Sequence, residues 1–332
     1  MVSDISGTSG GERVPAPLRY VSFNQLRSFH AVASAGSVTR AAQMLFVSQP
    51  TVTVQLRQLE SSYGVELVHR NRGGMQLTDV GRGLFAVTER IFALEHEAVD
   101  LLQNASGLLI GHLRVGGVGP YFVMGLLAEF SRRYPAIQLS LALGNSEVAI
   151  TDLLEYRNDV AVVGRPVGQG LDDTRLTTVT LSRQRVAFCV NRDHRWAGRH
   201  GVRLADLAGE PLIMRESGSS SRLALEIAMA TANVDANVVL EVNREGVLEA
   251  AAAGLGVGVT TDAEFRADDR LTMLHILDAE VATDAIVVSL RERQEAPLVS
   301  AFMAIAKAVA AAGTSGDHTS NPFGHTQGRA AG

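Results

Sequence analysis

The sequence predicts an α+β protein of several domains: a small helical N-terminal domain, one long helix, and a C-terminal α/β domain with two lobes. Three observations predict this fold class. Apolar residues recur at helical spacing in short segments between Phe23 and Thr78, and again without interruption from Asp79 to about Ala105. After Gly107, short apolar strands alternate with helical segments, which is typical of βαβ units on a mostly parallel sheet. The chain has 332 residues, of which 46% are hydrophobic and 20% charged, so it can bury several cores.

The two ends of the sequence differ from this folded part. Residues 1–19 and 313–332 are rich in small and polar residues without an apolar period, so we expect disordered tails. No apolar run is long enough to span a membrane and the first residues lack a signal pattern, which predicts a cytoplasmic protein without a membrane partner. Cys189 is the only cysteine, lies in an apolar run, and is expected to be buried and unreactive. No Cys/His cluster has metal-binding spacing, so we expect neither a metal nor a cofactor.

The N-terminal segment predicts three helices joined by short turns. The first begins at Phe23, the second spans Val38–Phe46 and the third spans Gln49–Tyr63. Ser37 and Ser48 precede the second and third helices, where a serine caps a helix by accepting a backbone N–H. Two short helices joined in this way predict a helix-turn-helix.

The third of these helices has one apolar and one polar face. Val52, Leu56 and Leu59 share the face that must point to the core. The opposite face carries Gln49, Pro50, Thr53, Val54 and Arg57. Glutamine and threonine hydrogen-bond to base edges and arginine reaches phosphate or guanine, so this face fits the major groove of DNA. The alternative is an amphipathic helix whose polar face is only solvated.

The segment from His69 to Thr78 places two arginines and a Gly-Gly turn between short apolar runs. This pattern predicts a β-hairpin wing from which Arg70 and Arg72 contact the DNA backbone. The net charge of the chain is −5, but the stretch from Tyr20 to Thr78 holds five arginines and only two glutamates, so basic charge is concentrated there. Thr78 is expected to cap the long helix that follows.

The C-terminal part predicts two sets of strands and helices. The first set has strands at 112–118, 137–143 and 159–163 and helices at 121–134 and 147–156. The second set has strands at 185–190, 211–214, 238–242 and 256–260 and helices at 221–232 and 245–253, followed by a strand at 284–290 and a helix at 296–311. We expect one lobe at 107–180 and 284–312, a second lobe at 181–283, and a cleft between them. The chain is expected to cross between the lobes near 178–183 and to return near 281–284.

Five motifs carry a resemblance to a known family: Leu26-Arg-Ser-Phe-His-Ala-Val-Ala, Gly36-Ser-Val-Thr-Arg-Ala-Ala, Ser48-Gln-Pro-Thr-Val-Thr, Leu59-Glu60 and Leu77-Thr-Asp-Val-Gly81. Over about residues 20–312 the chain resembles the LysR-type transcriptional regulators. The resemblance implies a winged helix-turn-helix DNA-binding domain at 20–78, a linker helix at 79–106 that dimerises, and a periplasmic-binding-protein-like effector domain at 107–312. The implied partners are double-stranded DNA, a small-molecule effector and further copies of the chain in a homodimer, usually assembled as a dimer of dimers.

The same resemblance identifies the residues expected to contact DNA. They are Ser37, Thr39, Arg40, Ser48, Gln49, Pro50, Thr51, Thr53, Val54, Arg57, Arg70 and Arg72. Two positions depart from the family pattern: Leu67-Val68 stands where the family commonly has Leu-Phe, and Val54 stands where many members carry a polar or basic residue. The first affects packing, and the second puts one base or phosphate contact in question.

Loops that begin helices on both lobes predict an anionic effector, because helix N-termini offer free N–H groups and the positive end of the helix dipole. The segment 215–222 has four serines and two arginines around a helix start, a composition suited to phosphate, phosphonate or carboxylate. The alternative for this segment is a flexible polar loop with a serine cap. The expected effector-binding residues are Gly119, Tyr121, Asn145, Ser146, Glu147, Arg165, Arg215, Glu216, Ser217, Ser219, Ser220, Arg222 and Arg244.

Four stretches, at 144–147, 154–163, 214–218 and 263–266, look like the subgroup of the family associated with 2-aminoethylphosphonate catabolism. That resemblance implies that serines and Arg215 or Arg222 hold the phosphonate. It also implies that Glu147 or Glu216 meets the ammonium group. Glu147 has an alternative role as an ordinary acidic residue in the first turn of its helix.

Two other function classes are weighed against a regulator. A solute-binding module would use the same lobes without DNA, and an enzyme would need a catalytic set on this scaffold. The glycines of 254–258 enter a strand instead of opening a helix, which excludes a dinucleotide loop. Ser217 lies in no nucleophile elbow and has no assignable base, so we expect no enzyme. We therefore expect a transcription regulator, with activation as the commoner outcome in the family.

Overall fold

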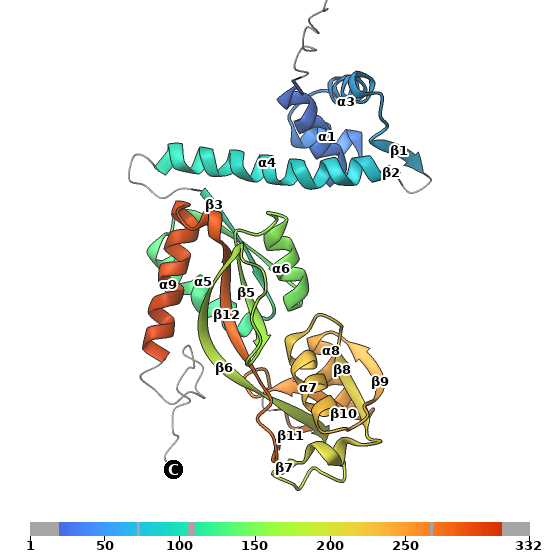
Figure 1. The fold of residues 1–332 in the computed structure, drawn as a ribbon, viewed down its shortest axis with the longest axis vertical. Coiled ribbons are helices and arrows are strands. Elements are labelled where there is room, and N and C mark those ends of the chain that lie inside the picture. Colours follow the sequence, from blue (N-terminus) through green and yellow to red (C-terminus); the bar gives the residue numbers. More distant parts are fainter. Residues whose placement is uncertain (1–19, 72–73, 105–110, 266–267, 314–332) are drawn as a thin grey trace, which may run out of the picture. The chain divides into compact units, whose positions relative to one another are not determined.

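The computed structural model describes residues 20–71, 74–104, 111–265 and 268–313 (Figure 1). The chain divides into two compact units, Met1–Ile91 and Phe92–Gly332, and each is described by itself. The tails that are expected to be disordered lie outside the described residues, except that Gly313 ends the last helix.

Three helices, a hairpin and the start of a long helix form the first unit. They are α1 (Phe23–Ala35), α2 (Val38–Met44), α3 (Gln49–Tyr63), β1 (Val68–Asn71), β2 (Gly74–Leu77) and α4 (Asp79–Asn104). Phe29, Val32 and Val52 are fully buried at the centre of the three helices. The helix-turn-helix predicted from the sequence is therefore present, with its apolar faces turned inward.

The second helix is shorter than predicted. The sequence predicted Val38–Phe46, but α2 ends at Met44. Phe46 has a φ of 54° and its side chain is 95% exposed. A residue in the left-handed region cannot continue a right-handed helix, so the turn between α2 and α3 begins before Phe46.

The hairpin is tied closely to the long helix. β1 and β2 pair antiparallel, with Asn71 opposite Gly74. Thr78 caps α4 as predicted, because its Oγ1 accepts the backbone N–H of Gly81 at 3.0 Å. A Cβ at position 81 would lie 2.1 Å from the carbonyl oxygen of Leu67, so only glycine allows the strand to approach the helix so closely.

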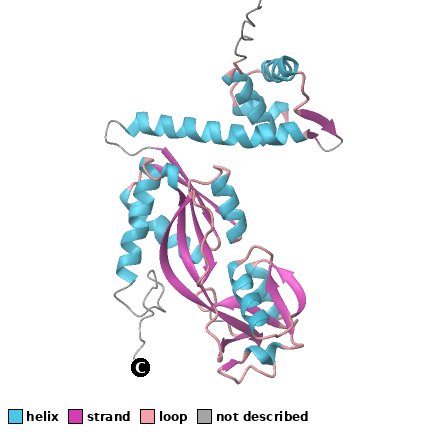
Figure 2. Cartoon of the chain, in the orientation of Figure 1, coloured by secondary structure: helices cyan, strands magenta, loops and turns pink. Residues whose placement is uncertain are grey.

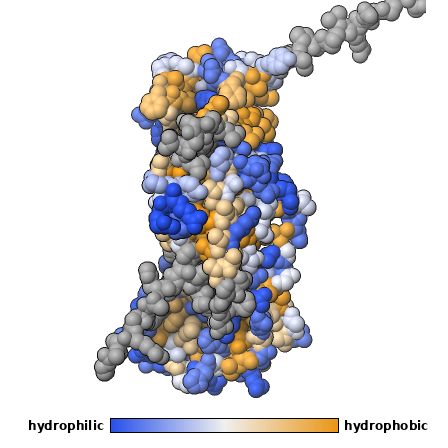
Figure 3. All heavy atoms as spheres, turned by 90° about the vertical axis from the view of Figure 1, so that its left-hand side faces the viewer, coloured by the Kyte–Doolittle hydropathy of each residue, from blue (hydrophilic) through white to orange (hydrophobic). Residues whose placement is uncertain are grey.

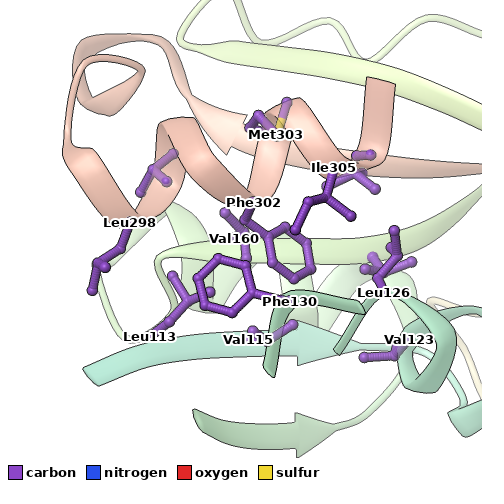
Figure 4. Close-up of a cluster of buried hydrophobic side chains, with 14 of the residues drawn as sticks. Leu113, Val115, Val123, Leu126, Phe130, Val160, Leu298, Phe302, Met303 and Ile305 are labelled. Atoms are coloured by element: carbon purple, nitrogen blue, oxygen red, sulfur yellow. The ribbon is translucent and has the colours of Figure 1, made fainter. Parts of the chain in front are cut away.

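The first lobe of the second unit is a sheet with helices on both faces. β3 (Gly111–Gly117) pairs in parallel with β4 (Ile137–Leu143) and β5 (Val160–Pro166), and β12 (Ala282–Leu290) pairs antiparallel with β5. The helices are α5 (Pro120–Arg133), α6 (Ser146–Leu154) and α9 (Pro297–Gly313). Phe130 of α5 and Phe302 of α9 meet over the sheet with ring centroids 5.6 Å apart (Figure 4). Leu113 and Val160 line the same buried cluster, which fixes α5 and α9 on one face of the sheet.

The second lobe repeats this arrangement on a smaller scale. Its strands are β7 (Gly201–Val202), β8 (Pro211–Arg215), β9 (Asn237–Val242), β10 (Val257–Thr261) and β11 (Leu271–Ile276), and its helices are α7 (Ser220–Thr231) and α8 (Arg244–Ala252). Short 3-10 turns lie at Leu204–Leu207 and, in the first lobe, at Arg291–Arg293. Trp196 and Phe188 are fully buried in its core. Cys189 is buried as predicted, and burial raises the pKa of its thiol to about 12.

One strand, β6 (Leu176–Asn191), runs through both lobes (Figure 2). Its residues up to Arg185 pair with β12, and those from Val186 on pair with β10 and β11. The sequence predicted a strand only at 185–190, which is too short, because β6 begins at Leu176. The predicted crossing near 178–183 lies within this strand, which passes from the first lobe to the second at Arg185 and Val186. The polar residues in the first half of β6 are compatible with a strand because β12 supplies a hydrogen-bonding partner along the whole length of that half. The short strands β7 and β11 were also not predicted.

No helix among the described residues is long and apolar enough to cross a membrane. On the face that Figure 3 turns to the viewer, polar and apolar residues are intermixed. On α4, three apolar residues, Val80, Val87 and Leu94, follow one another at seven-residue spacing and are each about half exposed. They form an apolar stripe along the helix, which is the pattern that a partner helix packs against.

Candidate functional sites

The helix α3 presents the predicted polar face to solvent. Val52, Leu56 and Leu59 are buried, which confirms that they lie on the core side. Gln49, Pro50 and Arg57 are exposed, Val54 is half exposed and Thr53 is partly covered. Thr39 and Arg40 of α2 are exposed as well. The residues predicted to meet DNA bases thus lie on a surface that a major groove can reach.

Local hydrogen bonds fix the start of this face. Ser48 caps α3 by accepting the N–H of Thr51 at 3.3 Å, and Ser37 caps α2 through the N–H of Arg40 at 3.5 Å. Thr39 Oγ1 donates to the side-chain carbonyl of Gln49 at 3.3 Å. This bond uses the oxygen of the Gln49 amide, so its NH₂ group is the donor that it can offer to an acceptor such as a base edge.

The hairpin is held against α3 by Glu60, a residue whose role the sequence did not reveal. Its Oε1 accepts the backbone N–H of Leu67 at 2.8 Å and that of Val68 at 3.3 Å. Arg70 is in β1 opposite Met75, but its side chain lies outside what the structure describes. Arg72 also lies outside the described residues. The contact of both arginines with DNA stays a prediction.

A small cavity of about 20 Å³ lies between the two lobes of the second unit. A cavity of this size holds about one water molecule. Its lining comes from both lobes and from the two crossing strands: Val118, Asn145, Ser146, Val163, Gly164, Gln184, Arg215, Ser219, Ser220, Ser221, Arg244, Thr261, Glu264, Thr283 and Ala285. Six of the residues predicted to bind an effector are among them, namely Asn145, Ser146, Arg215, Ser219, Ser220 and Arg244.

The N-termini of three helices meet at this cavity. Asn145 caps α6 by accepting the N–H of Val148 at 3.0 Å, and Asn243 caps α8 through the N–H of Gly246 at 2.9 Å. Ser219 precedes α7, makes no side-chain cap, and shares a 3.2 Å hydrogen bond with Ser221. Three positive helix ends and several hydroxyl groups favour a negatively charged ligand here.

Arg244, in the first turn of α8, is paired inside the cavity wall. Its guanidinium donates one hydrogen bond to the carboxylate of Glu264 and another to the carbonyl oxygen of Val118 on the opposite lobe. Burial lowers the pKa of Arg244, although the negative charge of Glu264 opposes this effect. A Cβ at Gly119 would lie 2.7 Å from Arg244 Nη1, so glycine at that position gives the guanidinium its room.

Arg215, at the end of β8, is the second buried cation of the cavity. Its Nε and Nη2 donate to the two carboxylate oxygens of Glu216, both at 2.9 Å. Burial acts to lower the pKa of Arg215, but the hydrogen bond and charge of Glu216 outweigh it and raise the pKa above its ordinary value. The Nη1 group is the part of this guanidinium that Glu216 does not engage.

Several predicted effector residues lie outside the cavity lining. Arg222 donates to Glu226 at 2.7 Å and to the carbonyl oxygen of Arg215 at 2.8 Å, and it also pairs with Glu241. The sequence placed it in the site because the segment 215–222 combines serines and arginines around a helix start, but these partners hold its side chain outside the cavity lining. Arg165 faces Asp284 at 3.5 Å. Gly119, Glu147, Glu216 and Ser217 are near the cavity or at its rim without lining it, and the side chain of Tyr121 lies outside what the structure describes.

The structure also adds residues that sequence reasoning missed. Gln184 comes from β6 and Thr283 from β12, Thr261 is the last residue of β10, and Glu264 lies in the turn that follows it. The hydroxyl of Thr261 is buried and has no hydrogen-bond partner among the described residues. No motif marked Gln184, Thr261 or Thr283, because they reach the cavity through the pairing of β6, β10 and β12 and not through a helix start. Glu264 lies in the stretch 263–266, which the sequence singled out as a resemblance but not as a binding residue.

The two lobes touch directly beside the cavity. Asn145 Nδ2 donates to the carbonyl oxygen of Ser217 at 2.9 Å, and the N–H of Glu147 donates to that of Gly218 at 3.4 Å. A Cβ at Gly164 would lie 2.1 Å from the hydroxyl of Ser220, so the start of α7 packs against bare backbone of β5. These contacts hold the lobes in a closed arrangement.

Two family descriptions match this chain. Residues 23–82 match "Bacterial regulatory helix-turn-helix protein, lysR family". Residues 106–311 match "LysR substrate binding domain". The first match covers the helix-turn-helix and hairpin, and the second covers both lobes and the cavity.

Individual proteins agree with these matches. The HTH-type transcriptional regulator CbbR of Sinorhizobium medicae is 32% identical over 297 residues, which are 86% of this chain and 92% of the relative. The HTH-type transcriptional activator CmpR of Synechocystis is 30% identical over 266 residues, 79% of this chain and 86% of the relative. The solved regulatory domain of CcmR from Synechocystis, in complex with 2-PG, is 28% identical and has a TM-score of 0.54, covering 60% of this chain and 97% of that domain.

Proposed function

Because this chain belongs to the LysR family of bacterial transcriptional regulators, we propose that it activates transcription when a small anion binds between its lobes. Its relatives are DNA-binding transcriptional regulators and not enzymes. The observation that carries the effector proposal is the cavity into which two buried arginines and three helix N-termini converge. Activation is proposed because the relative CmpR is named an activator.

The proposed DNA contact is made by α3 and the hairpin. Gln49, Thr53 and Arg57 offer an amide, a hydroxyl and a guanidinium on the exposed face of α3, and these groups read base edges or hold phosphates. The exposed Thr39 and Arg40 and the cap at Ser48 lie at the same end of the helix pair. Sequence readout is assigned to Gln49 and Arg57, and backbone contacts to the remaining predicted residues.

The proposed effector carries a phosphate-like or carboxylate group. A related regulatory domain was solved in complex with 2-PG, and this chain offers serine and threonine hydroxyls beside two arginines in the cavity between its lobes. The narrower resemblance to regulators of 2-aminoethylphosphonate catabolism has no counterpart among the relatives named above. That phosphonate therefore enters only as one anion to be tested.

The proposed assembly is a dimer that pairs into a dimer of dimers. The stripe of Val80, Val87 and Leu94 on α4 supplies apolar surface for a partner helix. Two copies would place two recognition helices on successive turns of one DNA face, which is how helix-turn-helix dimers bind two half-sites.

The test uses the full-length protein and a fluorescent duplex from the region upstream of its own gene. Fluorescence anisotropy at several salt concentrations is expected to give binding that weakens steeply as salt rises, because phosphate contacts release counterions. A thermal-shift screen with inorganic phosphate, 2-PG, 2-aminoethylphosphonate and small carboxylates is expected to find an anion that raises the melting temperature. If the protein does not bind the duplex in dilute buffer, the proposed DNA binding is contradicted. If no anion raises its melting temperature, the proposed anionic effector is contradicted.

A further inference from the structure

We propose that Glu264 is a built-in competitor of the effector: its carboxylate occupies Arg244, and a dianionic phosphate or phosphonate group binds by displacing it. The inference rests on the proposed function of the cavity as the effector site. It goes further by naming the residue that sets the affinity and the charge of the ligand that can enter.

The geometry places Glu264 where a ligand anion would bind. Glu264 and Arg244 both line the cavity, and their side chains are only 9% and 14% exposed. Arg244 Nη1 donates to Glu264 and Nη2 donates to the carbonyl oxygen of Val118. Each terminal nitrogen of the guanidinium therefore already uses one N–H, and an incoming anion can take the position at Nη1 only by displacing the Glu264 carboxylate.

The charges of the cavity require such an exchange. Arg215 and Arg244 are balanced by Glu216 and Glu264, so the four groups together carry no net charge. A dianion added to this set would leave two uncompensated negative charges in a buried place, which is strongly unfavourable. If Glu264 leaves, the two guanidinium groups face the ligand, and the acids that remain near them are Glu216 at the rim and the exposed Glu245.

Available space leads to the same conclusion. The cavity of about 20 Å³ admits roughly one water molecule, which is less than a phosphate group needs. Glu264 lies in the turn that follows β10, where its N–H bonds to the carbonyl oxygen of Thr261 at 3.1 Å. Withdrawal of its carboxylate enlarges the cavity beside Arg244 without disturbing a helix or strand.

A second observation points to a ligand at this place. Thr261 is 3% exposed and its hydroxyl has no partner, although buried hydroxyls are normally hydrogen-bonded. It lines the same cavity as Arg244 and Glu264. A phosphate oxygen that replaces the Glu264 carboxylate would supply the acceptor that this hydroxyl lacks.

Competition of this kind selects the ligand by charge. A monocarboxylate offers Arg244 no more than Glu264 already does, so it gains little by exchange. A dianionic phosphate or phosphonate offers charge to both arginines and displaces Glu264. Affinity should therefore fall as pH drops below the second pKa of the phosphate group, about 6 to 7.

The experiment compares full-length wild-type protein with Glu264→Gln. Glutamine keeps the size of the side chain and an oxygen that can accept from Arg244, but it removes the competing charge. Isothermal titration with inorganic phosphate and with 2-PG is expected to show at least about tenfold tighter binding for the variant. The matched control is Glu245→Gln, which removes an exposed charge near the same arginines without touching the cavity. Its affinity for both anions is expected to change less than about twofold.

Three results would overturn the inference. If Glu264→Gln and Glu245→Gln tighten anion binding equally, only the overall electrostatic potential near the arginines matters. Unchanged or weaker binding by Glu264→Gln would mean that Glu264 does not compete. If Glu264→Gln loses affinity for 2-aminoethylphosphonate but not for ethylphosphonate, Glu264 binds the ammonium group of the ligand. The variant Arg215→Lys tests the proposed effector site separately from the role of Glu264. If this variant binds the anions as tightly as the wild type does, the ligand lies elsewhere and the proposed site itself is wrong.

Discussion

Asp159 links three parts of the second unit through buried charges. It accepts from Arg114 Nη2 at 2.8 Å and from Arg293 Nη1 at 2.7 Å, and Arg293 also bonds to Glu97 of α4 at 2.9 Å. Burial acts to raise the pKa of Asp159, but the bonds and charges of both arginines outweigh it and lower the pKa. A carboxylate with a lowered pKa stabilises the folded state above its unfolded pKa, and this contribution is lost as pH falls through the folded pKa.

The change Asp159→Asn should therefore destabilise the protein by about 3 kcal/mol near pH 7, because it leaves Arg114 without its counter-ion and leaves the buried Arg293 with Glu97 alone. Urea unfolding at several pH values measures the effect. The difference from wild type is expected to shrink as pH is lowered into the acid range. Asp173→Asn is the control, since Asp173 also has a lowered pKa, to about 2, but pairs with an exposed Arg175. If both variants lose the same free energy of unfolding, the stabilising role assigned to the buried ion pairs of Asp159 is contradicted.

Arg57 gives the most direct test of the proposed DNA-binding face of α3. Its replacement by alanine is expected to weaken duplex binding roughly tenfold and to lower the slope of log affinity against log salt by about one, as for one lost phosphate or guanine contact. Anisotropy titrations at several salt concentrations measure both. Arg132→Ala removes an exposed arginine from α5 and serves as the control. Wild-type affinity for the Arg57 variant would place the contact elsewhere.

At the scale of elements, the sequence predicted those parts whose signals are local. The caps at Ser37, Ser48 and Thr78 and the apolar face of α3 follow from neighbouring residues, and the structure has them where expected. The first half of β6 could not be predicted, because its polar residues become a strand only through pairing with β12, about a hundred residues later. Such non-local pairing has no periodic signal of its own.

The stripe on α4 gives a prediction at the same scale. The double change Val87→Asp and Leu94→Asp places two charges in the proposed helix-helix interface. At about 2 kcal/mol each, the dimer dissociation constant should rise roughly a thousandfold. Analytical ultracentrifugation of the full chain measures the distribution of species. Ala86→Asp adds a charge on an exposed part of the helix outside the stripe and should leave the distribution unchanged. An assembly that survives the double change would exclude this stripe as the interface.

For the whole molecule, β6 is a continuous strand shared by both lobes, and the chain returns from the second lobe directly into β12 of the first, so the lobes can open or close only by bending at these two crossings. The contacts of Asn145 with Ser217 and of Arg244 with Val118 hold the closed arrangement beside the cavity. A ligand that binds there changes the balance between open and closed lobes only if it prefers one of them.

The candidate site was predictable only in part for a related reason. Helix starts such as Asn145, Ser219 and Arg244 can be recognised from sequence, and they do reach the cavity. The direction of the Arg222 side chain depends on its ion pairs with Glu226 and Glu241. No sequence motif identifies these two residues as its partners. Thr261 enters from the end of β10 and Glu264 from the turn that follows, and neither lies at a helix start, the signal from which the binding residues were predicted.

The most direct test of the account measures whether the anion site controls DNA binding. The anion that most raises the melting temperature is titrated into full-length protein bound to a duplex with a dye at each end, and affinity and end-to-end distance are followed by anisotropy and energy transfer. The account predicts that the anion changes the affinity or the bend for the wild type, and that Arg215→Lys abolishes this response. An anion that binds the protein yet leaves both quantities unchanged, or an undiminished response in the variant, would contradict it.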